Sequence, residues 1–165
     1  MKYNKLELYN RLTRTAQKSP CQKLGFACAL MKRDFLTIVT YNAPLKWSKF
    51  VCDDECVRFE IPSRTQSMIG ACGHAEERAI WKAIEKYKTA QDSHLYVTGV
   101  HKPSNEPMIY NRTGFSCIRC ATIMNYAKVK SINWWINGKT LVSQTPQEAY
   151  KSSIEFALGK TKTNY

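Results

Sequence analysis

Hydrophobic residues recur at helical spacing in four segments of the chain and form short, β-branched or aromatic runs in four others. The segments with helical period cover residues 4–18, 74–88, 118–128 and 146–158. The runs typical of strands cover residues 24–31, 35–41, 94–98 and 131–136, and a further short strand is expected at 140–143. The chain is therefore expected to alternate helices and strands in the order α β β α β α β α.

Local signals support several of these boundaries. Pro20 ends the first helix, because the residue before a proline is pushed out of the helical region. In residues 74–88 the acidic side chains come first and the lysines last, which suits the helix dipole. Pro146 is expected near the first position of the last helix.

This element order predicts one three-layer α/β/α domain over residues 1–165, with a mixed sheet of four or five strands. Strands that follow helices usually join a sheet through right-handed crossovers, which leave helices on both faces. Residues 43–72 show no clear period and are expected to form an irregular insertion. Residues 159–165 form a polar, basic tail.

The composition of the chain indicates the cellular compartment in which such a domain would be found. The chain has no apolar run near the roughly 18 residues of a membrane span, and its first residues lack a signal-peptide-like stretch. A cytoplasmic, non-membrane protein is expected. Its seven cysteines would then be metal ligands, catalytic thiols or core residues rather than disulfides.

Two motifs point to a metal. His74 opens one predicted helix, and Cys117 and Cys120 open another. Alone, the cysteine pair could be half of a structural zinc site or a redox pair. One imidazole and two thiolates together leave a fourth tetrahedral position open, which is the pattern of a catalytic zinc. Glu76 follows His74 closely enough to exchange protons with water activated by the metal, without being a ligand.

These motifs match the H-x-E and C-x-x-C parts of the signature of zinc-dependent base deaminases. The segments GHAEERAI, LYVT and SCIRCATIMNYAKVKSI follow the helix–strand–helix–strand core of that group. The sequence thus resembles the cytidine deaminase superfamily over roughly residues 10–136. It looks most like the deoxycytidylate (dCMP) deaminases, on the segments Thr15–Cys21, Leu24–Leu30 and Tyr41-Asn42.

The chain also departs from the pattern of these deaminases. Ser116 stands where the family has a proline before the first cysteine. Thr40 and Ala43 replace the glycines that flank Tyr-Asn, a motif that belongs to the triphosphate regulatory site of dCMP deaminases. The loop 99–116 is longer than usual and is expected near the mouth of the pocket, where it could alter substrate choice.

The resemblance implies a cytidine deaminase-like fold and a role for each matching residue. His74, Cys117 and Cys120 match the zinc ligands, and Glu76 matches the proton shuttle. Superfamily members usually assemble into oligomers, so a homo-oligomer is expected.

The resemblance also implies how a nucleotide substrate is held. Asn42 matches an asparagine that hydrogen-bonds the sugar. The backbone around Ala75 and Ser116 would contact the polar edge of the base. An aromatic side chain should stack on the base, and Trp135 is the candidate.

Four further cysteines could close a second, structural zinc site, which some dCMP deaminases carry nearby. They are Cys21, Cys52, Cys56 and Cys72. The alternative is a set of buried thiols, because their spacing matches no named zinc motif. Cys28, inside an apolar strand, is expected in the core.

The formal charge of +12 has three possible interpretations. Residues 1–40 alone carry eight Lys/Arg against two Asp/Glu, a net of +6 and half of the total. The excess could capture a nucleotide phosphate, follow a polynucleotide backbone, or form an ordinary solvated surface.

Three functions follow. The first is zinc-dependent deamination of a deoxycytidine nucleotide, dCMP to dUMP. The second is deamination of cytosine or adenine in single-stranded DNA or RNA, including tRNA. The third is a non-catalytic, zinc-stapled nucleic-acid-binding domain.

Overall fold

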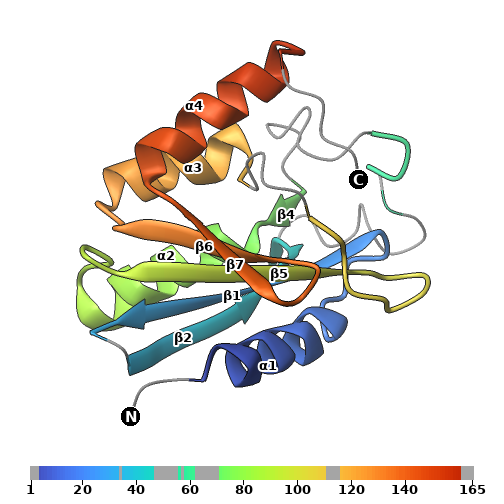
Figure 1. Ribbon diagram of the computed structural model, residues 1–165, viewed down its shortest axis with the longest axis horizontal. Coiled ribbons are helices and arrows are strands. Elements are labelled where there is room, and N and C mark those ends of the chain that lie inside the picture. Colours follow the sequence, from blue (N-terminus) through green and yellow to red (C-terminus); the bar gives the residue numbers. More distant parts are fainter. Residues whose placement is uncertain are drawn as a thin grey trace.

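A five-stranded mixed sheet is the centre of the computed structural model, which describes residues 4–33, 35–46, 56, 58–61, 71–110 and 116–160 (Figure 1). The strands follow the order β2-β1-β5-β6-β7. Their bounds are β1 (Leu24–Lys32), β2 (Phe35–Tyr41), β5 (His94–His101), β6 (Ser131–Ile136) and β7 (Thr140–Gln144). Strands β5 and β6 are parallel, and the other neighbouring pairs are antiparallel.

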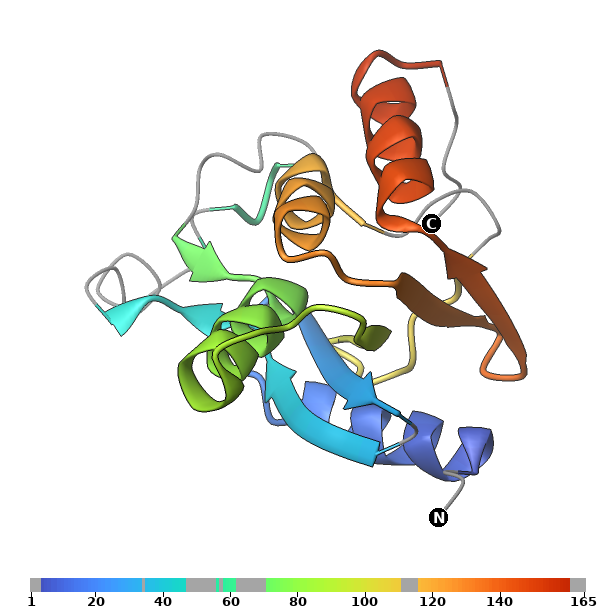
Figure 2. The same ribbon diagram turned by 90° about the vertical axis from the view of Figure 1, so that its left-hand side faces the viewer.

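Four helices in the described part of the chain cover the two faces of this sheet. They are α1 (Lys5–Gln17), α2 (Ala75–Tyr87), α3 (Ile118–Tyr126) and α4 (Pro146–Ala157). Helix α1 packs on one face, and α2, α3 and α4 lie on the other (Figure 2). The predicted three-layer α/β/α fold with a mixed sheet is confirmed, including the short strand β7. None of the described helices is long and apolar enough to cross a bilayer.

Each face of the sheet has its own hydrophobic core. On the α1 face, Leu8 and Leu12 pack beneath the sheet together with Trp135. On the other face, Trp134 and Ile132 meet the apolar sides of α2, α3 and α4. Adjacent strand residues point to opposite faces, so the two tryptophans of β6 enter different cores, and both are buried.

A small second sheet leads into the helix that carries His74. Strands β3 (Ala43–Pro44) and β4 (Cys72–Gly73) pair antiparallel, and α2 follows directly. The sequence does not predict either strand, because a two-residue strand is too short to show a hydrophobic period. Much of the expected insertion 43–72 and most of the basic tail 159–165 lie outside the described residues.

Candidate active site

The N-terminal ends of α2 and α3 carry the predicted metal ligands. His74 is the N-cap of α2 and Cys117 is the N-cap of α3, both with extended backbone. Cys120 lies one turn further, so both sulfur atoms emerge on the same side of α3. Two helix N-termini therefore point their partial positive charge at one place, which favours thiolate ligands there.

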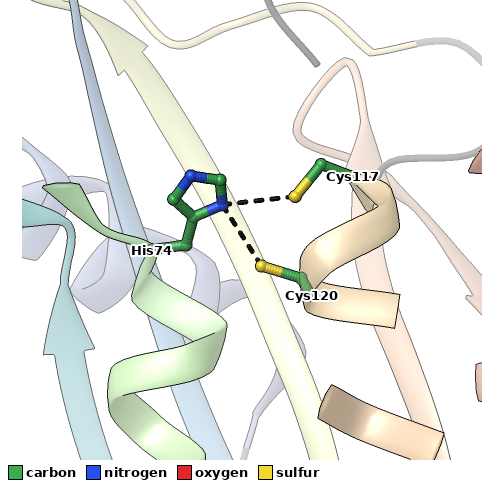
Figure 3. A group of neighbouring side chains, drawn as sticks. All are labelled: His74, Cys117 and Cys120. Carbon is green, nitrogen blue, oxygen red and sulfur yellow. Dashed lines mark hydrogen bonds between the residues drawn. The ribbon is translucent and has the colours of Figure 1, made fainter. Parts of the chain in front are cut away.

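These three side chains converge. Figure 3 shows the imidazole of His74 turned towards the two sulfur atoms, with its Nδ1 atom 3.2 Å from Sγ of Cys120 and 3.3 Å from Sγ of Cys117. All three potential ligand atoms lie within 4.8 Å of one another. In the described part of the chain, this is the one group of three or more His, Cys, Asp or Glu side chains with that spacing.

The group fits a zinc ion. Tetrahedral coordination would separate a nitrogen and a sulfur ligand by about 3.5 Å, so the observed contacts need to widen by only a few tenths of an ångström. One nitrogen and two sulfurs are ligands that zinc prefers, and a three-residue set leaves a coordination position for water or substrate. His74, Cys117 and Cys120 would hold the ion.

The two cysteines differ in how readily their thiols ionise. The Cys120 thiol hydrogen-bonds to Cys117 and, with the nearby His74, holds the pKa of Cys117 well below its usual value. The same contact and burial raise the pKa of Cys120 well above its usual value. Burial opposes a charge on His74, but the Cys117 sulfur outweighs it and raises the His74 pKa. Cys117 is therefore the cysteine of the pair that ionises more readily. Cys120 would lose its proton when a metal binds.

Glu76 lies beside this group and is itself buried, with 6% of its surface exposed. Burial raises the pKa of its carboxyl group, while the nearby His74 opposes that rise. The carboxyl is within hydrogen-bonding reach of the Cys120 side chain. A buried carboxyl with a raised pKa holds a proton more readily than an exposed one, which suits a general acid–base group.

Three contacts around the ligands were not anticipated from the sequence. Arg119, between the two cysteines, contacts both carboxylate oxygens of Glu77 at 2.7 Å. The Thr40 hydroxyl donates to the Ala75 carbonyl oxygen at 2.7 Å. The Ser153 hydroxyl donates to the Ser116 carbonyl oxygen, also at 2.7 Å. The only sign of these contacts in the sequence is the opposite charge of Glu77 and Arg119, which lie in the two motifs.

Three predicted substrate contacts have different surroundings. Ala75 and Ser116 are buried beside the ligands, at the start of α2 and just before α3. Asn42 lies beside the start of β1. Its Oδ1 atom accepts hydrogen bonds from the Ser19 hydroxyl and from the Phe26 N–H group. Its Nδ2 atom donates to the Leu24 carbonyl oxygen. Asn42 thus ties together the chain around β1, and a contact with a sugar remains a prediction.

Trp135 does not reach the metal-ligand group. Its side chain is 2% exposed and packs in the core on the α1 face, with its ring 5.4 Å from that of Tyr9 and 6.0 Å from that of Tyr96. His74 and both cysteine ligands belong to the starts of α2 and α3, the helices that pack on the opposite face. The assignment of Trp135 as the stacking residue is wrong, because the alternation of β6 points its ring away from the site.

Cys21 lies beside two of the other cysteines predicted for a second zinc, although the described cysteines form no further group with the close spacing of the first. The Cys21 thiol hydrogen-bonds with the side chain of Cys72 and with that of Cys56, and the first of these contacts is the main cause that lowers its pKa to about 5. Lys23 holds the Cys56 segment in place, because its ammonium group donates to the carbonyl oxygens of Arg58, Phe59 and Ile61. The fourth predicted ligand, Cys52, lies outside the described residues.

Together, the fold and the metal-ligand group define the class of this protein as a zinc-dependent deaminase. The family model of the cytidine and deoxycytidylate deaminase zinc-binding region matches residues 3–136. The chain belongs to this family, and the predicted superfamily is confirmed. No curated protein sequence matches the chain.

The chain shares its fold with a solved dCMP deaminase structure. The apo crystal structure of dCMP deaminase from the cyanophage S-TIM5 aligns with a TM-score of 0.50 and 16% sequence identity, over 81% of this chain and 87% of that one. Its complex with dCMP and dUMP aligns with a TM-score of 0.48 and 16% identity, over 80% and 83% of the two chains. At this identity, the apo structure shows a shared fold.

Proposed function

We propose that the protein catalyses the hydrolytic deamination of a deoxycytidine nucleotide, with dCMP as substrate and dUMP and ammonia as products. The observation that carries this proposal is the buried carboxyl of Glu76 beside the convergent His74, Cys117 and Cys120 side chains. Membership of the cytidine and deoxycytidylate deaminase family supports a deamination reaction and favours cytosine as the base.

Glu76 carries the proton transfers of this reaction. Zinc, when bound, lowers the pKa of water towards about 7 and so supplies a nucleophile at neutral pH. Hydrolysis replaces the exocyclic amino group of cytosine by oxygen, so protons must pass from water to ring N3 and to the departing ammonia. The carboxylate of Glu76 would accept one proton from water and deliver it to ring N3, and would then accept the second proton and deliver it to the departing ammonia.

Backbone groups at the two helix starts would orient the base. The first N–H groups of a helix have no partner inside the helix, and Ala75 stands at the first position of α2. The Thr40 hydroxyl holds the Ala75 carbonyl, which fixes this turn relative to β2. An N–H group held in this way suits the carbonyl oxygen of cytosine, and Ser116 would face the amino group.

A screen of zinc-loaded protein against CMP, dCMP, dCTP, cytidine and short oligonucleotides tests the substrate. We expect ammonia release and loss of cytosine absorbance with dCMP, and the Glu76→Gln variant should abolish both. Turnover of a cytosine in an oligonucleotide without turnover of dCMP would overturn the mononucleotide assignment.

A second candidate is deamination of a base in single-stranded DNA or RNA. It is favoured by the exposed basic side chains of α1, which are Arg11, Arg14 and Lys18. Helix α1 covers the sheet face opposite α2 and α3, so these charges exceed what one bound monophosphate would use. Oligonucleotide binding that weakens steeply with salt would support this candidate, and no binding at low salt would remove it.

We also propose a second zinc, bound by Cys21, Cys56 and Cys72 with Cys52. The support is the contact of Cys21 with two of these cysteines and its lowered pKa of about 5, which leaves a thiolate at neutral pH. Metal analysis should give two zinc ions per chain, and one after the change Cys21→Ser. One zinc in both proteins would leave these residues as buried thiols.

The expected homo-oligomer and cytoplasmic location remain predictions. Light scattering of the zinc-loaded protein, together with fractionation of the source cells, would test them.

A further inference from the structure

The ion pair between Glu77 and Arg119 joins the two helices that carry the metal ligands. Nη2 of Arg119 lies 2.7 Å from Oε1 and 2.7 Å from Oε2 of Glu77. The two side chains are 26% and 12% exposed, respectively, so the contact is largely shielded from water. Charge-assisted hydrogen bonds of this kind are stronger and more directional than ordinary surface ion pairs.

Both partners are placed next to ligands in the chain. Glu77 is three residues after His74, and its Oε2 atom also accepts from the His74 backbone N–H group at 3.3 Å. Arg119 lies between Cys117 and Cys120 in the first turn of α3. One carboxylate thus contacts the backbone of the nitrogen ligand and the side chain that separates the two sulfur ligands.

The two helices need such a connection. Their starts come from distant parts of the chain, at β4 and after β5, and the ligand atoms meet across the gap between them (Figure 3). A metal ligand set works best when its members are held in position before the ion arrives. The Thr40 and Ser153 hydrogen bonds hold each helix start against its own surroundings, and the Glu77–Arg119 pair spans the two.

We propose that Glu77 and Arg119 are positioning residues, which fix His74 relative to Cys117 and Cys120 and so hold the catalytic zinc. This inference rests on the assignment of the protein as a zinc-dependent deaminase. It does not depend on which nucleotide is the substrate. The opposing view is that the pair only stabilises the packing of α2 against α3.

Zinc release separates the two views. The zinc-loaded variants Glu77→Gln, Arg119→Met and the double variant would be mixed with an excess of a chromophoric chelator, and the rate of zinc transfer followed. We expect each single change to speed release at least tenfold. The double variant should release zinc no faster than the faster single variant, because either change already breaks the pair.

Two further measurements exclude a merely structural role. The visible spectrum of the cobalt-substituted protein reports the ligand geometry, and it should shift in both single variants. Arg119→Lys keeps the charge but not the paired contact, so it should release zinc at an intermediate rate. Glu85→Gln, an exposed change on the same helix, serves as the matched control and should leave release and spectrum unchanged.

The inference is overturned if the variants unfold more easily but release zinc at the wild-type rate and keep the wild-type cobalt spectrum. Should Arg119→Met fail to fold, zinc release and the cobalt spectrum of Glu77→Gln and Arg119→Lys would be compared with those of the wild type instead. Because no nucleotide is added, failure of the dCMP assignment would show in the substrate screen and leave this result untouched.

Discussion

The hydroxyl of Ser153 on α4 lies 2.7 Å from the backbone carbonyl oxygen of Ser116, the residue before the ligand Cys117, and 2.7 Å from that of Ala149, so its one proton is shared between the two acceptors. Both side chains are buried, with 3% and 1% of their surfaces exposed. Ser116 occupies the position where the family signature has proline, whose ring fixes the backbone. The contact with α4 therefore supplies from outside the restraint that a proline would supply within the turn.

The change Ser153→Ala should weaken this restraint. We expect a loss of about 1 kcal/mol in the free energy of unfolding, since a buried carbonyl loses a partner. We also expect a several-fold lower kcat with dCMP, because Cys117 is less firmly placed. Urea unfolding and steady-state kinetics measure the two effects.

Ser152→Ala is the matched control, because the Ser152 hydroxyl donates within α4 to Glu148 and does not touch the site. A Ser153→Ala protein with wild-type kcat would show that Cys117 needs no support from α4.

Much of this architecture could be predicted from the sequence because the elements are long and regular. The helical spacing of Leu8, Leu12 and Ala16 matches the buried side of α1, and all three are core residues. The metal ligands could be predicted as well. His74 and the C-x-x-C pair stand at helix starts, where short motifs imply position and direction.

What sequence could not supply were relationships between distant segments. The Ser153 and Thr40 contacts join residues that are 37 and 35 positions apart in the sequence, and no local sequence pattern predicts them. Trp135 was misplaced for the same reason. Its aromatic character suggested stacking on a base, but which face of β6 it occupies depends on the packing of α1.

Trp135 should behave as a core residue in mutagenesis. The change Trp135→Ala is expected to cost about 3–5 kcal/mol of stability through the cavity it leaves against Tyr9 and Tyr96. Trp135→Phe should fold and keep the wild-type KM for dCMP, because the ring faces away from the ligands. A large rise in KM for Trp135→Phe at unchanged stability would restore its role as the stacking residue.

Zinc should stabilise the folded protein as well as activate it. An ion that binds only the folded state adds about 4 kcal/mol at a thousandfold excess over its dissociation constant. Chelation should therefore lower the melting temperature and abolish turnover, and added zinc should restore both. Cys117→Ala should lose the part of this rise that the zinc at His74, Cys117 and Cys120 supplies, and any rise that is left would come from the proposed second zinc.

Cys28→Ala is the control for that experiment, since Cys28 is a buried thiol of β1 outside the ligand group. It should keep the rise in melting temperature. Equal zinc stabilisation of wild type and Cys117→Ala would contradict the ligand assignment.

Glu76 should be destabilising in the metal-free protein at neutral pH. Burial raises its folded-state pKa above the ordinary value of 4.5, so the folded state resists its ionisation. Below pH 4.5 both states carry the neutral acid and no penalty exists. As the pH rises through the raised pKa the penalty grows, and it is complete above it. Glu76→Gln should therefore stabilise the metal-free protein at pH 7, and the gain should vanish as the pH falls below 4.5.

The same change should lower kcat of the zinc-loaded protein by about 10²–10⁴, the usual contribution of a general acid–base group. Urea titrations of the metal-free variant at pH 4 to 8 and kinetics at pH 7 provide both readings, with exposed Glu85→Gln as the control. A variant that is inactive but less stable at pH 7 would mean that Glu76 stabilises the fold, and its loss of activity would then not identify a proton shuttle. Stability gained together with activity lost is the outcome expected of a charge buried for catalysis.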